Sequence, residues 1–251
     1  MFLVGWWPLR GDGTGKRGTL RGHLSLHCLD SLSAPEALVN KNLYSGKIRS
    51  MKTTPYHHGD LREALLTAAE TILRRDGLLA LTLRATAREA GVSHAAPGYH
   101  FGDLPGLLTE LAAVGLRRLG EQLKAIKSSP DRRTWDAARA YLAFARTHPA
   151  LFQLMFQSDR LEPGRPSLVE ARTEALRQLA QTRGIGDSEP SLAQLGHITG
   201  GWAIVHGFAM LLLDGRLAPL LATMPEGSVP EDLFEAMLAS AEKGLISSSR
   251  S

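Results

Sequence analysis

The sequence predicts an all-α protein with an N-terminal three-helix helix-turn-helix domain followed by a larger helical domain. Apolar residues from 61 to 73 recur at helical spacing, and a Gly-Val-Ser turn at 91–93 separates two short helical segments. Farther along, the segment 196–215 is apolar nearly all round. The 251 residues suffice for one large domain or two small ones with a sizeable core.

The first fifty residues differ in composition from the rest of the chain. Residues 1–51 hold seven basic and three acidic residues, whereas the remainder has 22 of each. The formal net charge of +4 therefore belongs to this segment and gives no evidence of nucleic-acid binding. Glycines break any periodicity there, and the apolar stretch precedes the charges, unlike in a secretory signal. We expect 1–50 to be a disordered extension, with Met51 as a candidate natural start.

Cysteine content and hydropathy favour a cytoplasmic protein without a membrane partner. Cys28 is the single cysteine, so an intramolecular disulfide is excluded and a reducing compartment is the default. No uninterrupted apolar run approaches the ~18 residues needed to span a bilayer. Apolar residues make up 43% and charged residues 22%, as in ordinary globular proteins.

Two helices with recognisable ends are predicted before the Gly-Val-Ser turn. The first runs through DLREALLTAAETILRRDG, where Asp60 and Glu63 fit a capping box and Gly77 fits the helix stop. Thr82 then fits the N-cap of LRATAREA, whose Leu83 and Ala87 share one side. With the segment after the turn, this order is the helix-turn-helix arrangement, with the longer first helix as its support.

The stretch GVSHAAPGYHFGD suits a helix that is displayed rather than packed. Gly91 supplies a turn conformation that other residues adopt only with strain, and Ser93 fits the N-cap of the next helix. Pro97 would lie in the first turn, where its missing N–H costs little. Small alanines allow close approach, and His94 and Tyr99 can hydrogen-bond phosphates or base edges. The pattern alone does not decide whether this stretch is a helix that binds DNA or an ordinary turn between two helices, and both interpretations stay open.

The segment 56–108 resembles, without gaps, the N-terminal domain of the tetracycline-repressor (TetR) family of transcriptional regulators. The resemblance rests on YHHGDLREALLTAAETIL and LTLRATAREAGVSHAAPGYHFGDLPGLL. It implies that certain residues face double-stranded operator DNA, namely Thr82, Arg84, Ser93, His94, Ala95, Tyr99 and His100. Three more could contact the DNA backbone before the first helix: Tyr56, His57 and His58. The chain departs from the family pattern at Gly98, commonly Tyr, and at Leu104, commonly Lys, and both usual residues touch phosphates.

A metal site is the rival interpretation of the histidines. His57, His58, Asp60, His94 and His100 are metal-ligand types, but no pair has the i, i+4 spacing with a glutamate typical of a zinc hydrolase. No nucleophile elbow, phosphate loop or paired-cysteine motif is present in the sequence. We therefore predict no catalytic residues, no metal and no cofactor, with a metal-dependent hydrolase as the weakest alternative.

The remaining chain reads as a series of helices joined by short connections. Helices are predicted at 105–127, 167–183, 190–213 and 230–246, and through TWDAARAYLAFARTHPALFQLMF, where Pro149 breaks or kinks the helix. Residues 159–166, RGIGDSEP and LDGRLAP are predicted connections. The domain boundaries expected are 51–104 for DNA binding, 105–246 for effector binding and dimerisation, and 247–251 for a disordered tail.

The segment GHITGGWAIVHGFAMLLLDG is predicted to be buried on more than one side. One side would pack on its own domain and the other on a second subunit, with Gly200, Gly201 and Gly207 permitting close helix approach. Its Trp-x-x-x-His-Gly pattern, with 145–152, is similar to the Trp-His-Gly type of C-terminal domain found in some TetR-like regulators. A packed core is the plain alternative for the aromatic residues here. The predicted ligand-binding residues are Tyr141, Phe152, Met155, Phe156, Trp202 and His206.

These observations predict a homodimeric transcriptional regulator. The first candidate is a repressor that a small molecule of unknown identity releases from its operator. The second candidate is a helical ligand-binding or interaction protein that has lost operator recognition, and Gly98 and Leu104 favour it.

Overall fold

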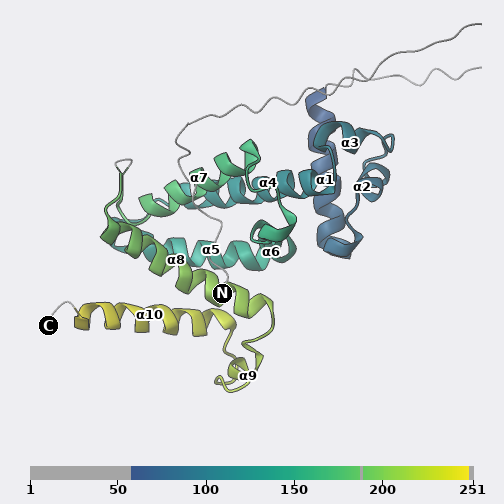
Figure 1. The fold of residues 1–251 in the computed structure, drawn as a ribbon. Helices are drawn as coiled ribbons and strands as arrows, with labels where there is room; N and C mark the ends of the chain where they lie inside the picture. The colour runs from purple at the N-terminus through teal and green to yellow at the C-terminus, as the bar shows by residue number, and fades with distance from the viewer. Residues whose placement is uncertain (1–57, 187–188, 249–251) are drawn as a thin grey trace, which may run out of the picture. The chain divides into compact units, whose positions relative to one another are not determined.

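A computed structural model describes residues 58–186 and 189–248, and every regular element within these ranges is a helix (Figure 1). This confirms the predicted all-α fold. Side chains are described over 61–186 and 189–241. The elements are α1 (His58–Asp76), η1 (Leu78–Ala80), α2 (Leu83–Glu89), α3 (Ala96–Phe101), α4 (Leu104–Lys124), α5 (Pro130–Thr147), α6 (Pro149–Met155), η2 (Ser158–Arg160), α7 (Pro166–Gln181), α8 (Leu192–Leu213), α9 (Ala218–Leu221) and α10 (Pro230–Ser248).

The first helix buries the predicted apolar stripe, and its C-terminal end lies where the sequence indicates. Leu65, Ala69 and Ile72 are buried, and Gly77 follows the helix with φ of +81°, a conformation that favours glycine. The expected capping box at Asp60 is wrong, because α1 already begins at His58 and Asp60 lies inside it. A helix extends past a potential cap residue when nothing stops it there.

The helix-turn-helix is formed by α2 and α3. The Thr82 side chain accepts a hydrogen bond from the Ala85 N–H at 3.1 Å, which confirms the predicted N-cap of α2. Gly91 lies in the turn with φ of +67°, as expected. The prediction for Ser93 is wrong: α3 begins only at Ala96, after a turn in which the Ser93 carbonyl, not its hydroxyl, accepts from the Ala96 N–H at 3.1 Å. That turn moves the helix start beyond the reach of a Ser93 cap.

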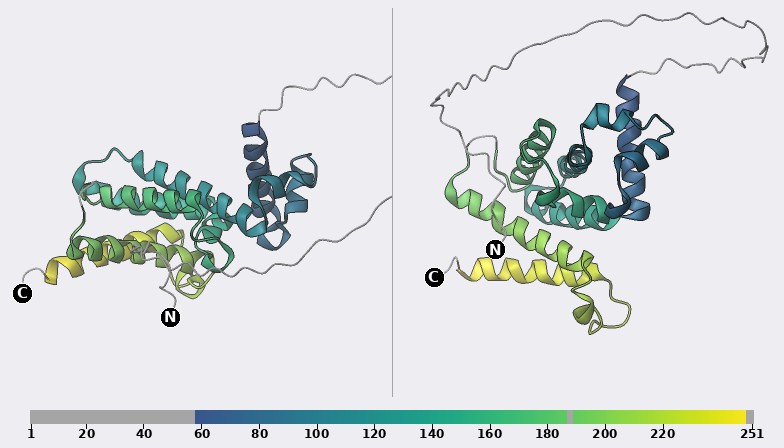
Figure 2. Two further views of the ribbon diagram at one scale, coloured as in Figure 1. Left: turned by 45° about the horizontal axis from the view of Figure 1, so that its top comes forward. Right: turned by 45° about the vertical axis from the view of Figure 1, so that its right-hand side comes forward.

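The long helix α4 contacts both the helix-turn-helix group and the C-terminal helices. It begins with Asp103 as N-cap, whose carboxylate accepts from the Gly106 N–H at 2.9 Å. Helices α1, α3, α5, α6 and α7 all contact it, and α7 lies along it (Figures 1 and 2). Leu107, Leu111 and Leu116 are buried in the core that these helices share.

The C-terminal helices follow the predicted order, with one addition. Helix α5 ends at Thr147 and α6 begins at Pro149, so proline divides this stretch as expected. Helix α8 packs on α5, and α10 lies beside α8 in Figures 1 and 2, where the rings of Phe208 and Phe234 are 5.0 Å apart. The short helix α9 was missed, because LDGRLAP has the composition of a connection.

Helix α8 is apolar on both of its faces but buried on only one in this protomer. Its buried residues are Ile198, Val205, Phe208 and Ala209, whereas Ile204 and Leu211 are exposed. By length and composition alone, α8 is the helix among the described residues that could cross a membrane. The predicted contact with the protein's own domain is confirmed, and the contact with a second subunit stays a prediction.

Candidate functional site

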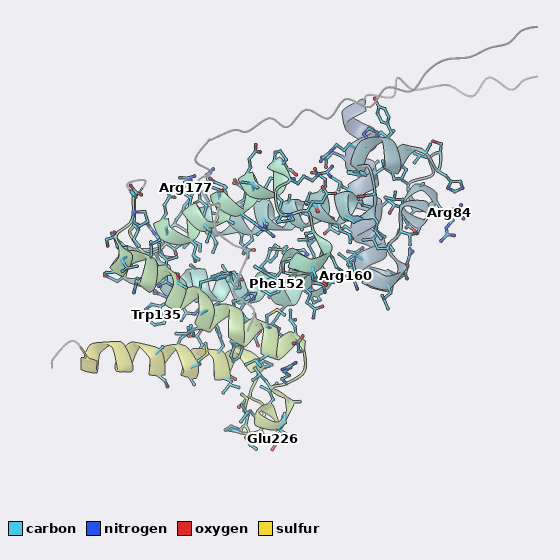
Figure 3. All side chains as sticks on the ribbon, viewed as in Figure 1. Arg84, Trp135, Phe152, Arg160, Arg177 and Glu226 are labelled. Atoms are coloured by element: carbon cyan, nitrogen blue, oxygen red, sulfur yellow. The ribbon has the colours of Figure 1, made fainter. Side chains whose placement is uncertain are left out.

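The start of α2 presents two of the predicted DNA-binding residues. Thr82 and Arg84 are exposed, and Arg84 points away from the neighbouring helices in Figure 3. Arg84 forms no ion pair with a described residue, because each salt bridge within those ranges joins other side chains. The guanidinium is thus available to a phosphate or a base edge.

The turn before α3 and the helix itself present the remaining predicted DNA-binding residues. Ser93, His94 and Ala95 are exposed, and Tyr99 is 82% exposed, an unusual value for a tyrosine. His100 is half-buried and stacks edge-on against Tyr99, with ring centroids 5.3 Å apart. The structure therefore places these side chains at one exposed corner, held by the buried Pro97 and Phe101 of the same helix.

Three predicted DNA contacts precede this corner in the chain. Tyr56 and His57 lie outside the described residues, and so does the His58 side chain, although the His58 backbone begins α1.

The two departures from the TetR pattern have different structural settings. Gly98 lies on α3, and a Cβ at this position would meet nothing within 4 Å, so packing does not require glycine there. Leu104 is the first residue of α4 and packs on the hydrophobic core. A lysine could not make that apolar contact with its charged end, so Leu104 stabilises the fold where the family commonly has a phosphate contact.

A buried carboxylate joins the helix-turn-helix group to the loop before α7. Glu110 on α4 is 5% exposed and accepts hydrogen bonds from Arg62 of α1, from Arg165 Nε at 2.8 Å and from the Ser167 hydroxyl at 2.9 Å. Burial by itself raises the pKa of Glu110, but the hydrogen bonds from Arg165 and Ser167 and the two positive charges outweigh it and lower that pKa. Glu110 is therefore ionised and fully engaged.

Two of these partners also reach the end of α3. The Arg165 guanidinium donates to the Phe101 carbonyl at 3.4 Å, and the Arg62 guanidinium lies over the Phe101 ring, 5.6 Å from its centroid. Gly106 makes room for this contact, because a Cβ there would overlap the Phe101 carbonyl oxygen and lie 2.7 Å from Arg165 Nη1. The Glu110 cluster, meaning Glu110, Arg62, Arg165 and Ser167, thus fixes the position of the recognition helix.

Helices α5 and α8 bring together three of the predicted ligand-binding residues. Trp202 Nε1 donates to the Tyr141 hydroxyl oxygen at 3.2 Å, and the same oxygen lies 2.9 Å from His206 Nδ1. Since Tyr141 accepts from Trp202, its own hydrogen is available for Nδ1, which puts the imidazole proton on Nε2. Burial lowers the pKa of His206 and raises that of Tyr141, so both rings are neutral near pH 7.

Phenylalanines from and beside α6 complete this aromatic cluster. The His206 ring centroid is 4.4 Å from that of Phe156 and 5.6 Å from that of Phe152. Phe152, labelled in Figure 3, is fully buried. Met155 instead packs against α4, where a Cβ on Gly115 would lie 2.6 Å from its sulfur atom. Five of the six predicted ligand-binding residues therefore form one cluster, and Met155 belongs to the core.

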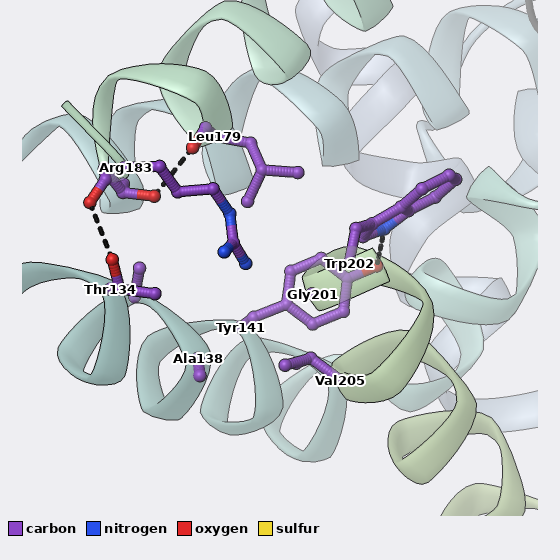
Figure 4. Close-up of a pocket in the computed structure, with 10 residues that line it drawn as sticks. Thr134, Ala138, Tyr141, Leu179, Arg183, Gly201, Trp202 and Val205 are labelled. Atoms are coloured by element: carbon purple, nitrogen blue, oxygen red, sulfur yellow. Dashed lines mark hydrogen bonds between the residues drawn. The ribbon is translucent and has the colours of Figure 1, made fainter. Parts of the chain in front are cut away.

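A cleft beside this cluster contains residues that sequence reasoning missed. It lies between α5, α7 and α8, has an empty volume of about 270 Å³ with open solvent included, and is lined by Tyr141, Trp202 and Arg183 among others (Figure 4). Arg183 was missed because it lies in a predicted connection, and because the residues of α5 and α8 that line the cleft with it are distant in sequence. Glu110 was missed as well, because a single glutamate in an apolar helix carries no motif.

Within the described residues, no group of three or more His, Cys, Asp or Glu side chains could hold a metal ion. His57, His58 and Asp60 of the rival metal hypothesis have no described side chains.

Comparison with known proteins places the chain in a family. A family model for the tetracyclin repressor-like C-terminal domain matches residues 136–241, a range that includes Trp202, His206 and Gly207. A search of curated proteins gave no match.

Solved structures share the fold over most of the described chain. A protein of unknown function from Rhodococcus sp. RHA1 is 34% identical, with a TM-score of 0.55, covering 75% of this chain and 95% of its own. A protein described as regulatory, SCO4313, is 23% identical, with a TM-score of 0.57 and coverage of 72% and 95%. Apo ActR from Streptomyces coelicolor is 19% identical, with a TM-score of 0.50 and coverage of 74% and 94%.

The last two similarities concern the fold alone. The family itself follows from the C-terminal match, and the helix-turn-helix formed by α2 and α3 agrees with it; the 34% identical relative, itself of unknown function, aligns with most of both chains. This chain belongs to the TetR-like family of transcriptional regulators.

Proposed function

We propose that the protein is a homodimeric, cytoplasmic repressor that binds a palindromic operator through α2 and α3 and leaves it when a small molecule binds among α5, α6 and α8. The observation that carries the proposal is the exposure of Arg84 at the start of α2, of His94 just before α3 and of Tyr99 on α3. Exposed donors on a helix-turn-helix suit phosphate and base-edge contacts in a major groove.

A second subunit is proposed to cover the outer face of α8. Gly196, Gly200, Ile204, Gly207 and Leu211 recur every three or four residues, and a Cβ at any of the three glycines would meet nothing within 4 Å. Ile204 is 41% and Leu211 42% exposed. A stripe of glycines flanked by apolar side chains permits close packing of two helices, and two-fold symmetry pairs it with itself.

Gly201 is excluded from that proposed contact surface. A Cβ at Gly201 would overlap the Arg183 guanidinium, so this glycine serves an internal contact. The close approach at Gly201 is therefore within its own domain, whereas Gly200, which points about 100° away around the helix, lies on the proposed contact surface.

Release of DNA is proposed to follow from contacts that connect the aromatic cluster to the recognition helix. Helix α6 carries Phe152 and contacts both α1 and α4, and the Glu110 cluster ties α1 and α4 to the end of α3. A ligand that favours another position of α6 would shift these helices, and it must bind the released form more tightly than the DNA-bound form.

Footprinting of the full chain on DNA upstream of its own gene tests the proposal. We expect two protected half-sites whose centres are about 34–36 Å apart along the duplex, the spacing of one DNA turn. Arg84→Ala should abolish the protection, whereas Arg177→Ala, on the distant helix α7, should leave it intact. Protection of a single half-site would contradict the symmetric dimer.

The alternative is a ligand-binding protein that has lost operator recognition. Within the described residues of α3, Gly98 is the residue that favours it. Because a side chain fits at this position, Gly98→Tyr tests whether the phosphate contact common in the family has been lost. Specific binding that appears only in Gly98→Tyr would support the alternative and overturn the repressor.

A further inference from the structure

The cleft between α5, α7 and α8 contains a cation whose position is defined by the surrounding chain. Figure 4 shows Arg183 extending between Leu179 and Gly201 toward Tyr141. The backbone at the end of α7 is anchored, because the Thr134 hydroxyl donates to the Thr182 carbonyl at 3.1 Å and the Thr182 hydroxyl donates to that of Leu179 at 2.7 Å. The direction of the Arg183 side chain therefore follows from packing.

The opposite wall is shaped to admit the guanidinium. A Cβ on Gly201 would overlap Arg183 Nη2 and lie 2.8 Å from Nη1. With glycine at this position of α8 the planar group lies against the helix backbone, and an added Cβ would make the end of the Arg183 side chain move. The pairing of Arg183 with Gly201 is thus a specific feature of the cleft.

Arg183 lacks a carboxylate partner among the described residues, in contrast to three arginines of the helix-turn-helix group and its neighbours. Arg62, Arg118 and Arg165 each form an ion pair with a glutamate. Arg183 forms none with a described residue, and its buried Nε has no hydrogen-bond partner there. Its Nη1 lies 3.4 Å from His197 Nε2. A desolvated cation without a counter-charge destabilises a fold.

Burial also lowers the pKa of Arg183, with no opposing charge to raise it. An anion beside the guanidinium would remove this penalty, and a carboxylate matches its two parallel donors.

The other walls restrict the kind of anion. Leu179, Val205 and the rings of Tyr141 and Trp202 supply mostly apolar surface. Trp202 Nε1 is already used by the Tyr141 hydroxyl, so the guanidinium is the main donor available in the cleft. A phosphate dianion would need more donors than one guanidinium supplies, whereas an organic monoanion needs one bidentate partner and apolar walls.

We propose that Arg183 binds the carboxylate of a small organic acid whose hydrophobic body lies against Leu179, Trp202 and Val205. The cleft is small and open to solvent, so we choose small acids with one apolar ring, such as benzoate or phenylacetate, to test it. Binding of the acid requires no DNA and stands by itself. The further statement that this acid is the effector rests on the proposed function.

Binding to the full chain without DNA tests the site. Tryptophan fluorescence and the thermal midpoint Tm are followed with benzoate, phenylacetate and hexanoate, each compared with its neutral amide. We expect at least one acid to quench fluorescence and raise Tm at concentrations where its amide does neither. Acids and amides acting alike, or no acid acting at all, would overturn the proposal.

Variants assign the effect to Arg183. Arg183→Met keeps the length of the side chain and should weaken acid binding at least tenfold. Gly201→Ala should weaken binding too, because its Cβ displaces the guanidinium. Arg177→Met is the matched control on α7, shortly before Arg183 in the chain: its side chain pairs with Glu174 and does not line the cleft, so acid binding should persist. Equal affinity in wild type and Arg183→Met would refute the assignment.

The unliganded protein provides a second criterion that does not depend on the choice of acid. If Arg183 has no partner within the protein, Arg183→Met should leave Tm unchanged or raise it. The nearest carboxylate in sequence, Asp187, lies outside the described residues, so Asp187→Asn is measured as well. A similar loss of Tm in Arg183→Met and Asp187→Asn would reveal an internal ion pair and overturn the proposal.

The DNA assay keeps the two proposals distinguishable. Acid binding that requires Arg183 supports the site even if the acid leaves the operator complex intact, in which case release by this ligand fails. Specific DNA binding without any acid binding overturns the site and leaves the DNA-binding regulator in place.

Discussion

Two tyrosines illustrate how environment decides the role of one residue type. Tyr99 is 82% exposed on α3, where its hydroxyl can reach only solvent or a partner, whereas Tyr141 is 4% exposed and bonds Trp202 and His206. The hydroxyl of Tyr99 is therefore available for the proposed DNA contact, and the hydroxyl of Tyr141 holds the aromatic cluster together.

We expect Tyr141→Phe to lower the free energy of unfolding by about 1–3 kcal/mol, because it leaves the Trp202 N–H and His206 Nδ1 without their common partner. Urea unfolding measures the change. Tyr99→Phe is the matched control and should leave unfolding unaltered. A fully stable Tyr141→Phe protein would show that solvent replaces the hydroxyl in this cluster.

The same Tyr99→Phe variant tests DNA recognition. Loss of one hydrogen bond should weaken operator binding by about 0.5–1.5 kcal/mol, which is roughly twofold to thirteenfold in affinity. Fluorescence anisotropy with labelled operator measures it. Unchanged affinity would remove the Tyr99 hydroxyl from the contact surface.

The state of Glu110 gives a pH dependence with a defined sign. Its folded pKa is lowered from the ordinary value of 4.5, so the unfolded chain binds more protons at acid pH. The stability that Glu110 contributes is complete above pH 4.5 and is lost as pH falls through its folded pKa. Glu110→Gln should therefore unfold at lower urea concentration near neutral pH, and the difference from wild type should shrink below pH 4.5. A difference independent of pH would contradict this account.

At the scale of elements, the sequence predicted those features of a helix that depend on residues close together in the chain. The stripe of α1, the Thr82 cap and the break at Pro149 were all predictable, because each depends on residues within a few turns. The Ser93 cap failed because the chain inserts a further turn before α3, an arrangement that depends on how Pro97 packs. Arg183 was missed because its importance arises from Gly201, which lies on another helix.

The outer stripe of α8 makes an element-scale prediction about assembly. In Gly207→Leu the side chain would meet nothing within the protomer at its Cβ, so the monomer should fold. A close contact between two α8 helices would be prevented, and the dimer should dissociate or lose thermal stability. Analytical ultracentrifugation and Tm measure this, with Thr199→Leu as a control at an exposed position of α8 outside the stripe. A Gly207→Leu dimer of undiminished stability would refute close approach at this glycine.

At the scale of the whole molecule, α4 connects recognition to the candidate ligand site. It contacts α1 and α3 as well as α5, α6 and α7, and its Glu110 joins the loop before α7 to the end of α3. The interior of the described domain is rigidly packed, so a change at the aromatic cluster has to be accommodated by movement of neighbouring helices. This is the physical basis for coupling a ligand to DNA affinity.

The central claim is specific DNA binding, and one measurement tests it most directly. Fluorescence anisotropy compares the full chain on DNA from upstream of its own gene with a scrambled duplex, at two salt concentrations. The account predicts preferential binding to the upstream DNA that persists at the higher salt, because base contacts outlast the loss of phosphate contacts. Equal, weak and salt-sensitive binding to both duplexes would contradict it.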